Sequence, residues 1–161
     1  MSKNIAKKNE SGFSLLGVIA AFFIITVGMV GVLGLANTTI KGSSLSKMRL
    51  IASGLAQEGI EVVRNMRADT DWTEWHTAVS NGDYIAQYNS SNLVSFFETP
   101  LKFNSISGLY QYDSGNNSPF YRKVSLTKVS NNEAKIVVEI KWQTKGQWHY
   151  LTVEDRLWDW R

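Results

Sequence analysis

Few side chains in this sequence of 161 residues are of the types that catalyse reactions or ligate metals. There is no cysteine, and the two histidines, His76 and His149, lie far apart along the chain. His149 stands between Trp148 and Tyr150 in a segment that we expect to be a strand. A hydrogen-bonded or surface histidine is therefore a better interpretation than a metal pair or a catalytic base.

Oxygen-bearing side chains gather in two loop-like segments. Asp69 and Asp71 form one group, and Asp113, Asn116 and Asn117 form the other. Such oxygens suit Ca²⁺, but neither spacing matches an EF-hand loop. The sequence also has no glycine-rich phosphate loop and no G-x-S-x-G motif. We expect no enzyme, no catalytic residue, no metal site and no cofactor.

Tryptophan pairs are the remaining groups with binding chemistry. Trp72 and Trp75 are three residues apart, and Trp158 and Trp160 are two apart near the carboxyl end. Exposed pairs would form an aromatic platform for sugars or surfaces, whereas in a domain this small tryptophan usually packs in the core. We expect core packing. The net charge of +3, scattered along the chain, does not indicate a nucleic-acid partner.

An uncharged segment precedes these groups. From Ser11 to Ile40 there is no ionisable side chain, and its apolar part, residues 13–36, would span about 36 Å as a helix. This length crosses a hydrocarbon layer of about 30 Å, so we predict one transmembrane helix. The competing interpretation is a secretory signal cut after Ala36, although its apolar region would exceed the usual length of about 7 to 15 residues.

The junction between the polar leader and the apolar helix has a distinctive order. Residues 1–12 form a short basic leader that ends in Gly12, and Phe13-Ser14-Leu15-Leu16 follows at once. This order resembles the amino terminus of type IV prepilins and pseudopilins. In that family a membrane-embedded aspartyl peptidase cuts after the glycine, on the cytoplasmic side, and methylates the new first residue. The resemblance implies that Gly12 ends the leader and that Phe13 is the methylated first residue.

The resemblance also implies partners and a location. The partners would be prepilin peptidase, the cytoplasmic membrane, other pilins through the amino-terminal helix, and a surface ligand of the head. The chain would span the cytoplasmic (inner) membrane once, with its head outside, and then enter an extracellular pilus or pseudopilus. Charge decides little about orientation. Three lysines precede the apolar segment and three basic residues follow it: Lys3, Lys7 and Lys8, then Lys41, Lys47 and Arg49.

One position departs from the family pattern. Most pilins carry glutamate at the fifth residue after the cleaved bond, where this chain has Gly17. A charge at mid-bilayer costs about 2.5 to 3.5 kcal/mol, so a family retains it for a purpose. In pilins that purpose is neutralising the methylated amino terminus of the preceding subunit. A first subunit has no such neighbour, so we hypothesise a minor pilin at or near the tip. The alternatives are that Gly17 only weakens incorporation, or that another polar contact replaces the glutamate.

The segment after the membrane helix has helical periodicity. We predict that residues 37–68 continue the helix of residues 13–36, because no proline interrupts the run as far as Met66. The stretch from Leu55 to Arg64 also resembles minor pilins of the PilV or PulI kind. The apolar or small residues share one face: Leu45, Met48, Ala52, Leu55, Gly59, Val62 and Met66. The charged residues lie mostly off that face: Lys47, Arg49, Glu58, Glu61, Arg64 and Arg67.

Residues 69–161 are expected to form a globular, β-rich head. Residues 69–119 predict long irregular connections with one or two short strands. Three strands should follow as an antiparallel meander: Phe120–Val129, Ala134–Gln143 and Gln147–Leu157. The fold class is therefore α+β, with a long amino-terminal helix, membrane-spanning in its first half, packed on a carboxyl-terminal antiparallel sheet.

Three functions fit these features. The first is a minor type IV pilin or pseudopilin that prepilin peptidase processes for a pilus or a secretion pseudopilus. The second is a membrane-anchored or tip-displayed binding module for adhesion or for DNA or glycan binding, with no shaft role. The third is an unprocessed bitopic sensor with a helical stalk. Only the first two predict a chain that begins at Phe13.

Overall fold

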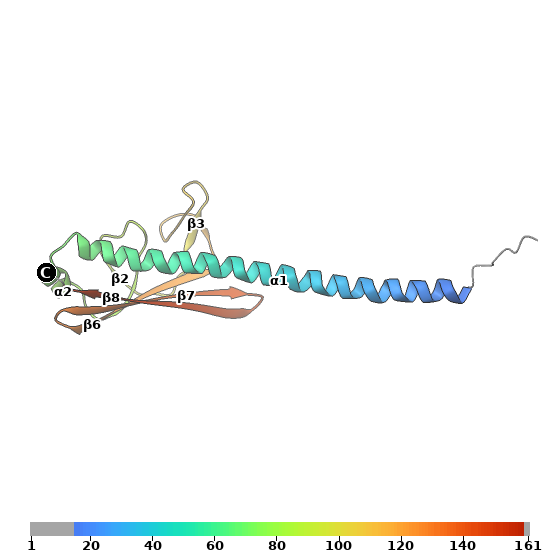
Figure 1. Ribbon diagram of the computed structural model, residues 1–161. Coiled ribbons are helices and arrows are strands. Elements are labelled where there is room, and N and C mark those ends of the chain that lie inside the picture. Colours follow the sequence, from blue (N-terminus) through green and yellow to red (C-terminus); the bar gives the residue numbers. More distant parts are fainter. Residues whose placement is uncertain (1–14, 160–161) are drawn as a thin grey trace, which may run out of the picture. The chain divides into compact units, whose positions relative to one another are not determined.

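The computed structural model describes residues 15–159. A 54-residue helix, α1 (Leu15–Ala68), leads into a short helix and a set of strands (Figure 1). The remaining elements are α2 (Trp72–Ala78), β1 (Gly82–Ile85), β2 (Val94–Ser95), β3 (Lys102–Asn104), β4 (Leu109–Gln111), β5 (Asn116–Asn117), β6 (Phe120–Ser130), β7 (Glu133–Thr144) and β8 (Gln147–Trp158). The fold class is α+β, as predicted.

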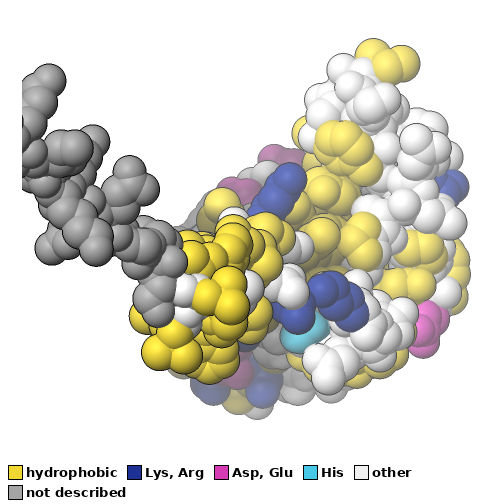
Figure 2. Space-filling model, turned by 90° about the vertical axis from the view of Figure 1, so that its right-hand side faces the viewer, with side chains coloured by type: hydrophobic (Ala, Val, Ile, Leu, Met, Phe, Trp, Pro, Cys, Tyr) yellow, Lys and Arg dark blue, Asp and Glu magenta, His cyan; other side chains and the backbone are white. Residues whose placement is uncertain are grey.

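The chain divides into two compact units, Met1–Ser44 and Leu45–Arg161, with the boundary inside α1. The described part of the first unit is helix alone, and its side chains are exposed apart from a half-exposed Val18. Figure 2 shows hydrophobic side chains around the helix where it adjoins the residues that are not described. By length and composition this helix can cross a membrane, as the sequence predicts.

A five-stranded antiparallel sheet is the main sheet of the second unit, which also contains the carboxyl-terminal part of α1. Its strand order is β2-β1-β6-β7-β8. The meander β6-β7-β8 confirms the three predicted strands, and each extends a residue or two beyond its predicted bounds. Lys145 and Gly146 both have positive φ in the turn between β7 and β8, a conformation typical of a two-residue hairpin turn.

Alternation along β6 and β7 places one face of the sheet against α1. Ile136, Val138, Ile140 and Trp142 are almost completely buried, while the residues between them are half-exposed, as the sequence predicts. Helix α1 contributes seven apolar or small residues to the core, from the predicted face and from positions beside it: Ala52, Leu55, Ala56, Gly59, Ile60, Val62 and Val63.

Arg67 corrects the predicted helix face. The periodicity placed it among the residues off the apolar face, yet only 7% of its surface is exposed. Its guanidinium carbon lies 5.6 Å from the centre of the Trp72 ring, a cation–π distance. The long side chain thus packs its charged end beside an aromatic ring of α2.

An ion pair with one fully buried partner joins α1 to the sheet. The Arg122 side chain of β6 is fully buried, and its Nη1 lies 2.9 Å from Glu58 Oε1. The same guanidinium donates to the backbone carbonyls of Leu55 and Ala86. Glu58 is therefore only partly on the solvent side, another departure from the predicted helix face.

The region between α1 and β6 holds more regular structure than predicted. It contains α2 and five short strands, where only one or two strands were expected. Asp71 caps α2, because its side chain accepts a hydrogen bond from the Thr73 amide at 3.2 Å. Strands β1 and β2 extend the main sheet, and β4-β3-β5 form a second, three-stranded sheet.

Candidate functional site

The predicted processing site, Gly12 and Phe13, lies outside the described residues. Gly17 is near the start of α1, where an added Cβ would have no neighbour within 4 Å. Open space likewise surrounds the other glycines of α1 in the first unit: Gly28, Gly31, Gly34 and Gly42. No contact within the described chain therefore requires glycine at position 17.

The two histidines are placed apart, each beside an aromatic ring. The His76 Nε2 atom lies 3.1 Å from the Ser130 carbonyl oxygen, and its ring stacks on Trp72 at 5.5 Å between centres. His149 stacks on Trp142 at 5.4 Å. His76 fits the interpretation of a hydrogen-bonded histidine, and His149 is half-buried beside Trp142.

The acidic and amide groups do not assemble into a metal centre. Asp71 caps α2, Asp113 accepts a hydrogen bond from Gln87 Nε2, and Asn116 and Asn117 pair with β3. Within residues 15–159, no three histidine, aspartate or glutamate side chains converge.

The described members of the two tryptophan pairs differ in burial. Trp72 and Trp75 are each 4% exposed and lie in the core, which confirms the expectation of core packing and excludes them as an exposed platform. Trp158 is 47% exposed, so the expectation of core packing is wrong for this residue; its predicted partner Trp160 lies outside the described residues. Trp142, on β7, is also buried.

An aromatic group on the outer face of the sheet was not predicted. Tyr121 and Trp148 lie edge to face at 5.9 Å. Lys141 Nζ lies 5.2 Å from the Tyr121 ring and 5.1 Å from the Trp148 ring, and it also pairs with Glu98 at 2.7 Å. Because an ammonium group already occupies the space beside both rings, this face is a poor platform for an uncharged ligand.

A pocket of about 340 Å³ lies in the second unit, and we name it the Trp75 pocket. Its walls come from the end of α1, from α2, from β1 and from the loop before β2. The lining residues include Met66, Glu74, Trp75, Tyr84, Asn92 and Leu93. Sequence reasoning missed this pocket because its residues belong to four segments that only the folded chain brings together.

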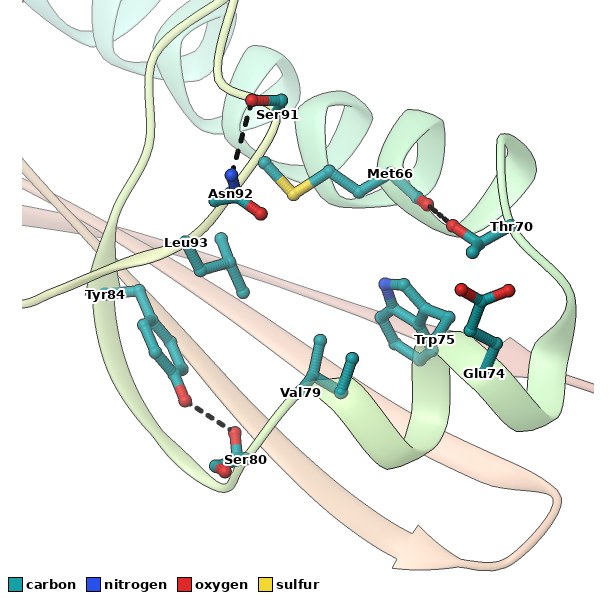
Figure 3. Close-up of a pocket in the computed structure, with 11 residues that line it drawn as sticks. Met66, Thr70, Glu74, Trp75, Val79, Ser80, Tyr84, Ser91, Asn92 and Leu93 are labelled. Carbon is teal, nitrogen blue, oxygen red and sulfur yellow. Dashed lines mark hydrogen bonds between the residues drawn. The ribbon is translucent and has the colours of Figure 1, made fainter.

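The Trp75 pocket combines an apolar interior with a polar rim. Figure 3 shows Met66, Leu93 and Val79 around the indole of Trp75, whose nitrogen edge turns toward the space between them. Within the described chain, the buried Trp75 Nε1 has no hydrogen-bond partner. At the rim, the side chains of Glu74 and Asn92 are exposed. The Tyr84 hydroxyl donates to the Ser80 carbonyl at 2.8 Å, which fixes its ring.

No protein-family model, no curated protein and no solved structure matches this chain.

Proposed function

We propose that this chain is a minor type IV pilin or pseudopilin. Prepilin peptidase would cut between Gly12 and Phe13 and methylate Phe13. The mature chain would wait in the cytoplasmic membrane with its β-rich unit outside. It would then enter a pilus or a secretion pseudopilus through α1. The proposal assigns the chain a structural role and no catalytic chemistry.

The observation that supports the proposal is that the two parts of α1 have different roles. Residues 15–36 expose a nearly continuous apolar surface that the chain itself does not cover, while residues beyond Leu45 form the core of the second unit. Exposed apolar surface of this extent needs lipid or other apolar helices around it. An apolar helix can exchange lipid for neighbouring helices because the two environments are similarly apolar. That exchange is what pilin assembly requires.

The first test is processing of the full chain co-expressed with a prepilin peptidase. We expect mass analysis to find a chain that begins at N-methylated Phe13. Gly12→Leu should block the cut, because a bulky side chain hinders the close approach of an extended backbone, whereas the neighbouring Ser11→Ala should be processed normally. A mature chain that begins at Met1 or Asn37 would overturn the proposal.

The second test concerns position in the filament. In the native filaments we expect tagged subunits at the ends, because Gly17 lacks the carboxylate that would neutralise a preceding amino terminus. Gly17→Glu should let subunits enter along the shaft as well, while Gly28→Ala on the same helix should not. Identical end-only labelling in the wild type and in Gly17→Glu would remove Gly17 from the explanation.

A further inference from the structure

We propose that the Trp75 pocket binds one ring of a neutral sugar. The inference does not depend on assembly into a filament, because every residue that lines the pocket belongs to the second unit. It gives the aromatic part of the chain a ligand class that neither the leader junction nor the fold specifies.

The unpartnered indole N–H of Trp75 is the first reason. The side chain is 4% exposed, and within residues 15–159 its Nε1 donates to no acceptor. A buried donor without a partner is uncommon and costly, and an acceptor atom of a bound ligand would satisfy it. A sugar hydroxyl or ring oxygen would accept this hydrogen bond. Met66, a flexible side chain that lines the same pocket, can move to admit it.

The distribution of polar and apolar groups is the second reason. Leu93 and Val79 offer apolar contact to the C–H face of a sugar ring, and Tyr84 adds an aromatic wall. Glu74 and Asn92 stand at the rim, where a carboxylate accepts from hydroxyl groups and an amide both donates and accepts. A purely apolar ligand would make no hydrogen bonds to these rim groups.

The charge and the size of the pocket restrict the class of ligand further. Among residues 15–159, no lysine, arginine or histidine lines the pocket, and Glu74 is its one acidic residue. A phosphate, a sulfate or an acidic sugar would therefore meet repulsion without compensation. A volume of about 340 Å³ is at the lower end of the range for small-molecule pockets. It suits one ring and part of a second.

Binding can be measured with the full chain in detergent micelles. We would label it with ¹⁵N and titrate glucose, galactose, mannose and N-acetylglucosamine separately while following the indole N–H resonances. One resonance, absent in Trp75→Phe, should shift with at least one of these sugars. Glu74→Gln and Asn92→Ala should each raise the Kd about tenfold, the effect of losing one hydrogen bond to a charged or well-placed group.

Matched controls lie outside the pocket. Glu61→Gln on α1 and Asn116→Ala on β5 repeat the same changes at exposed positions and should leave the Kd unchanged. Because Glu74 and Asn92 are exposed, their variants test the proposal even if Trp75→Phe fails to fold. A parallel measurement on immobilised glycans tells whether the pocket also binds the sugar at the end of a glycan chain. In that case the protein should be retained only by glycans in which this sugar is the terminal ring.

Three results would overturn the proposal. The first is the absence of any shift at the Trp75 resonance with all four sugars at tens of millimolar, the range in which weak sugar binding saturates. The second is binding that Glu74→Gln and Asn92→Ala leave unchanged, because the ligand then lies elsewhere. The third is a shift produced by phosphate, N-acetylneuraminate or lysine and by none of the neutral sugars.

Discussion

At the scale of single residues, two glutamates of α1 that are three positions apart have different environments. Glu58 pairs with Arg122, whose side chain is fully buried, at 2.9 Å, whereas Glu61 pairs with the half-exposed Arg64 at 3.8 Å. Removing one partner of a buried pair leaves a charge without compensation, but an exposed pair contributes little. The same Glu→Gln change should therefore have unequal effects.

We expect Glu58→Gln to lower the free energy of unfolding by about 3 kcal/mol, and Glu61→Gln to lower it by less than about 1 kcal/mol. Urea unfolding of the full chain in detergent, followed by tryptophan fluorescence, measures both. Equal losses in the two variants would show that burial of Arg122 does not make its partner important.

The burial of Tyr112 predicts that the free energy of unfolding changes at alkaline pH. Burial raises the pKa of its hydroxyl above the ordinary value of 10.0, and the hydroxyl donates to the Arg122 carbonyl at 3.3 Å. Between pH 10 and the raised pKa, the folded chain holds the proton that the unfolded chain releases. The contribution of Tyr112 to the free energy of unfolding is therefore complete below pH 10 and falls as pH rises through the raised pKa. The free energy of unfolding, measured from pH 8 upward, should fall more steeply in the wild type than in Tyr112→Phe. Parallel profiles would exclude Tyr112 as the cause.

At the scale of elements, the contact between α1 and the sheet depends on a glycine. A Cβ at Gly59 would lie 3.0 Å from Val138 Cγ1 and 3.2 Å from Arg122 Cδ, both from fully buried side chains. At Gly54, on the same helix, a Cβ would meet nothing within 4 Å. Glycine therefore permits close packing at one position and only weakens the helix at the other.

Substituting alanine at each glycine separates these effects. Gly54→Ala should stabilise the second unit by up to about 1 kcal/mol through helix propensity alone. Gly59→Ala should destabilise it by about 1 to 3 kcal/mol, because the buried neighbours must shift. Thermal unfolding of the two variants side by side is the measurement. A stabilised Gly59→Ala would mean that Val138 yields easily and that the contact is loose.

The sequence predicted the elements whose own pattern is long and regular. Alternation along β7 gave the buried face of the sheet, and the absence of proline gave the continuity of α1. The short elements between them have no such pattern, and contacts with residues far away in the sequence stabilise them. Trp72 Nε1, for example, donates to the Asn131 carbonyl at 2.8 Å across 59 positions. Arg67 was misplaced for the same reason, since Trp72 provides its partner ring. The Trp75 pocket shares this origin and was therefore not predictable.

At the scale of the whole molecule, the two units have opposite requirements for solvent. Every apolar residue of the core lies between Ala52 and Leu157, inside the second unit, and Leu45 and Met48 complete its packing. The described part of the first unit contributes no buried side chain. Its apolar surface should bind detergent or lipid, while the second unit has a complete core of its own.

The fragment of residues 45–161 should therefore be soluble without detergent and should unfold in one cooperative transition, as small single domains do. Its unfolding midpoint should be close to that of the full chain in detergent, because no core contact is lost at the boundary. Moving the start to residue 57 provides the control, since this removes Ala52, Leu55 and Ala56 from the core and should abolish cooperative unfolding. If the longer fragment aggregated or unfolded gradually, the second unit would depend on residues 1–44. The division of α1 between an apolar surface for assembly and a core for the β-rich unit would then be wrong.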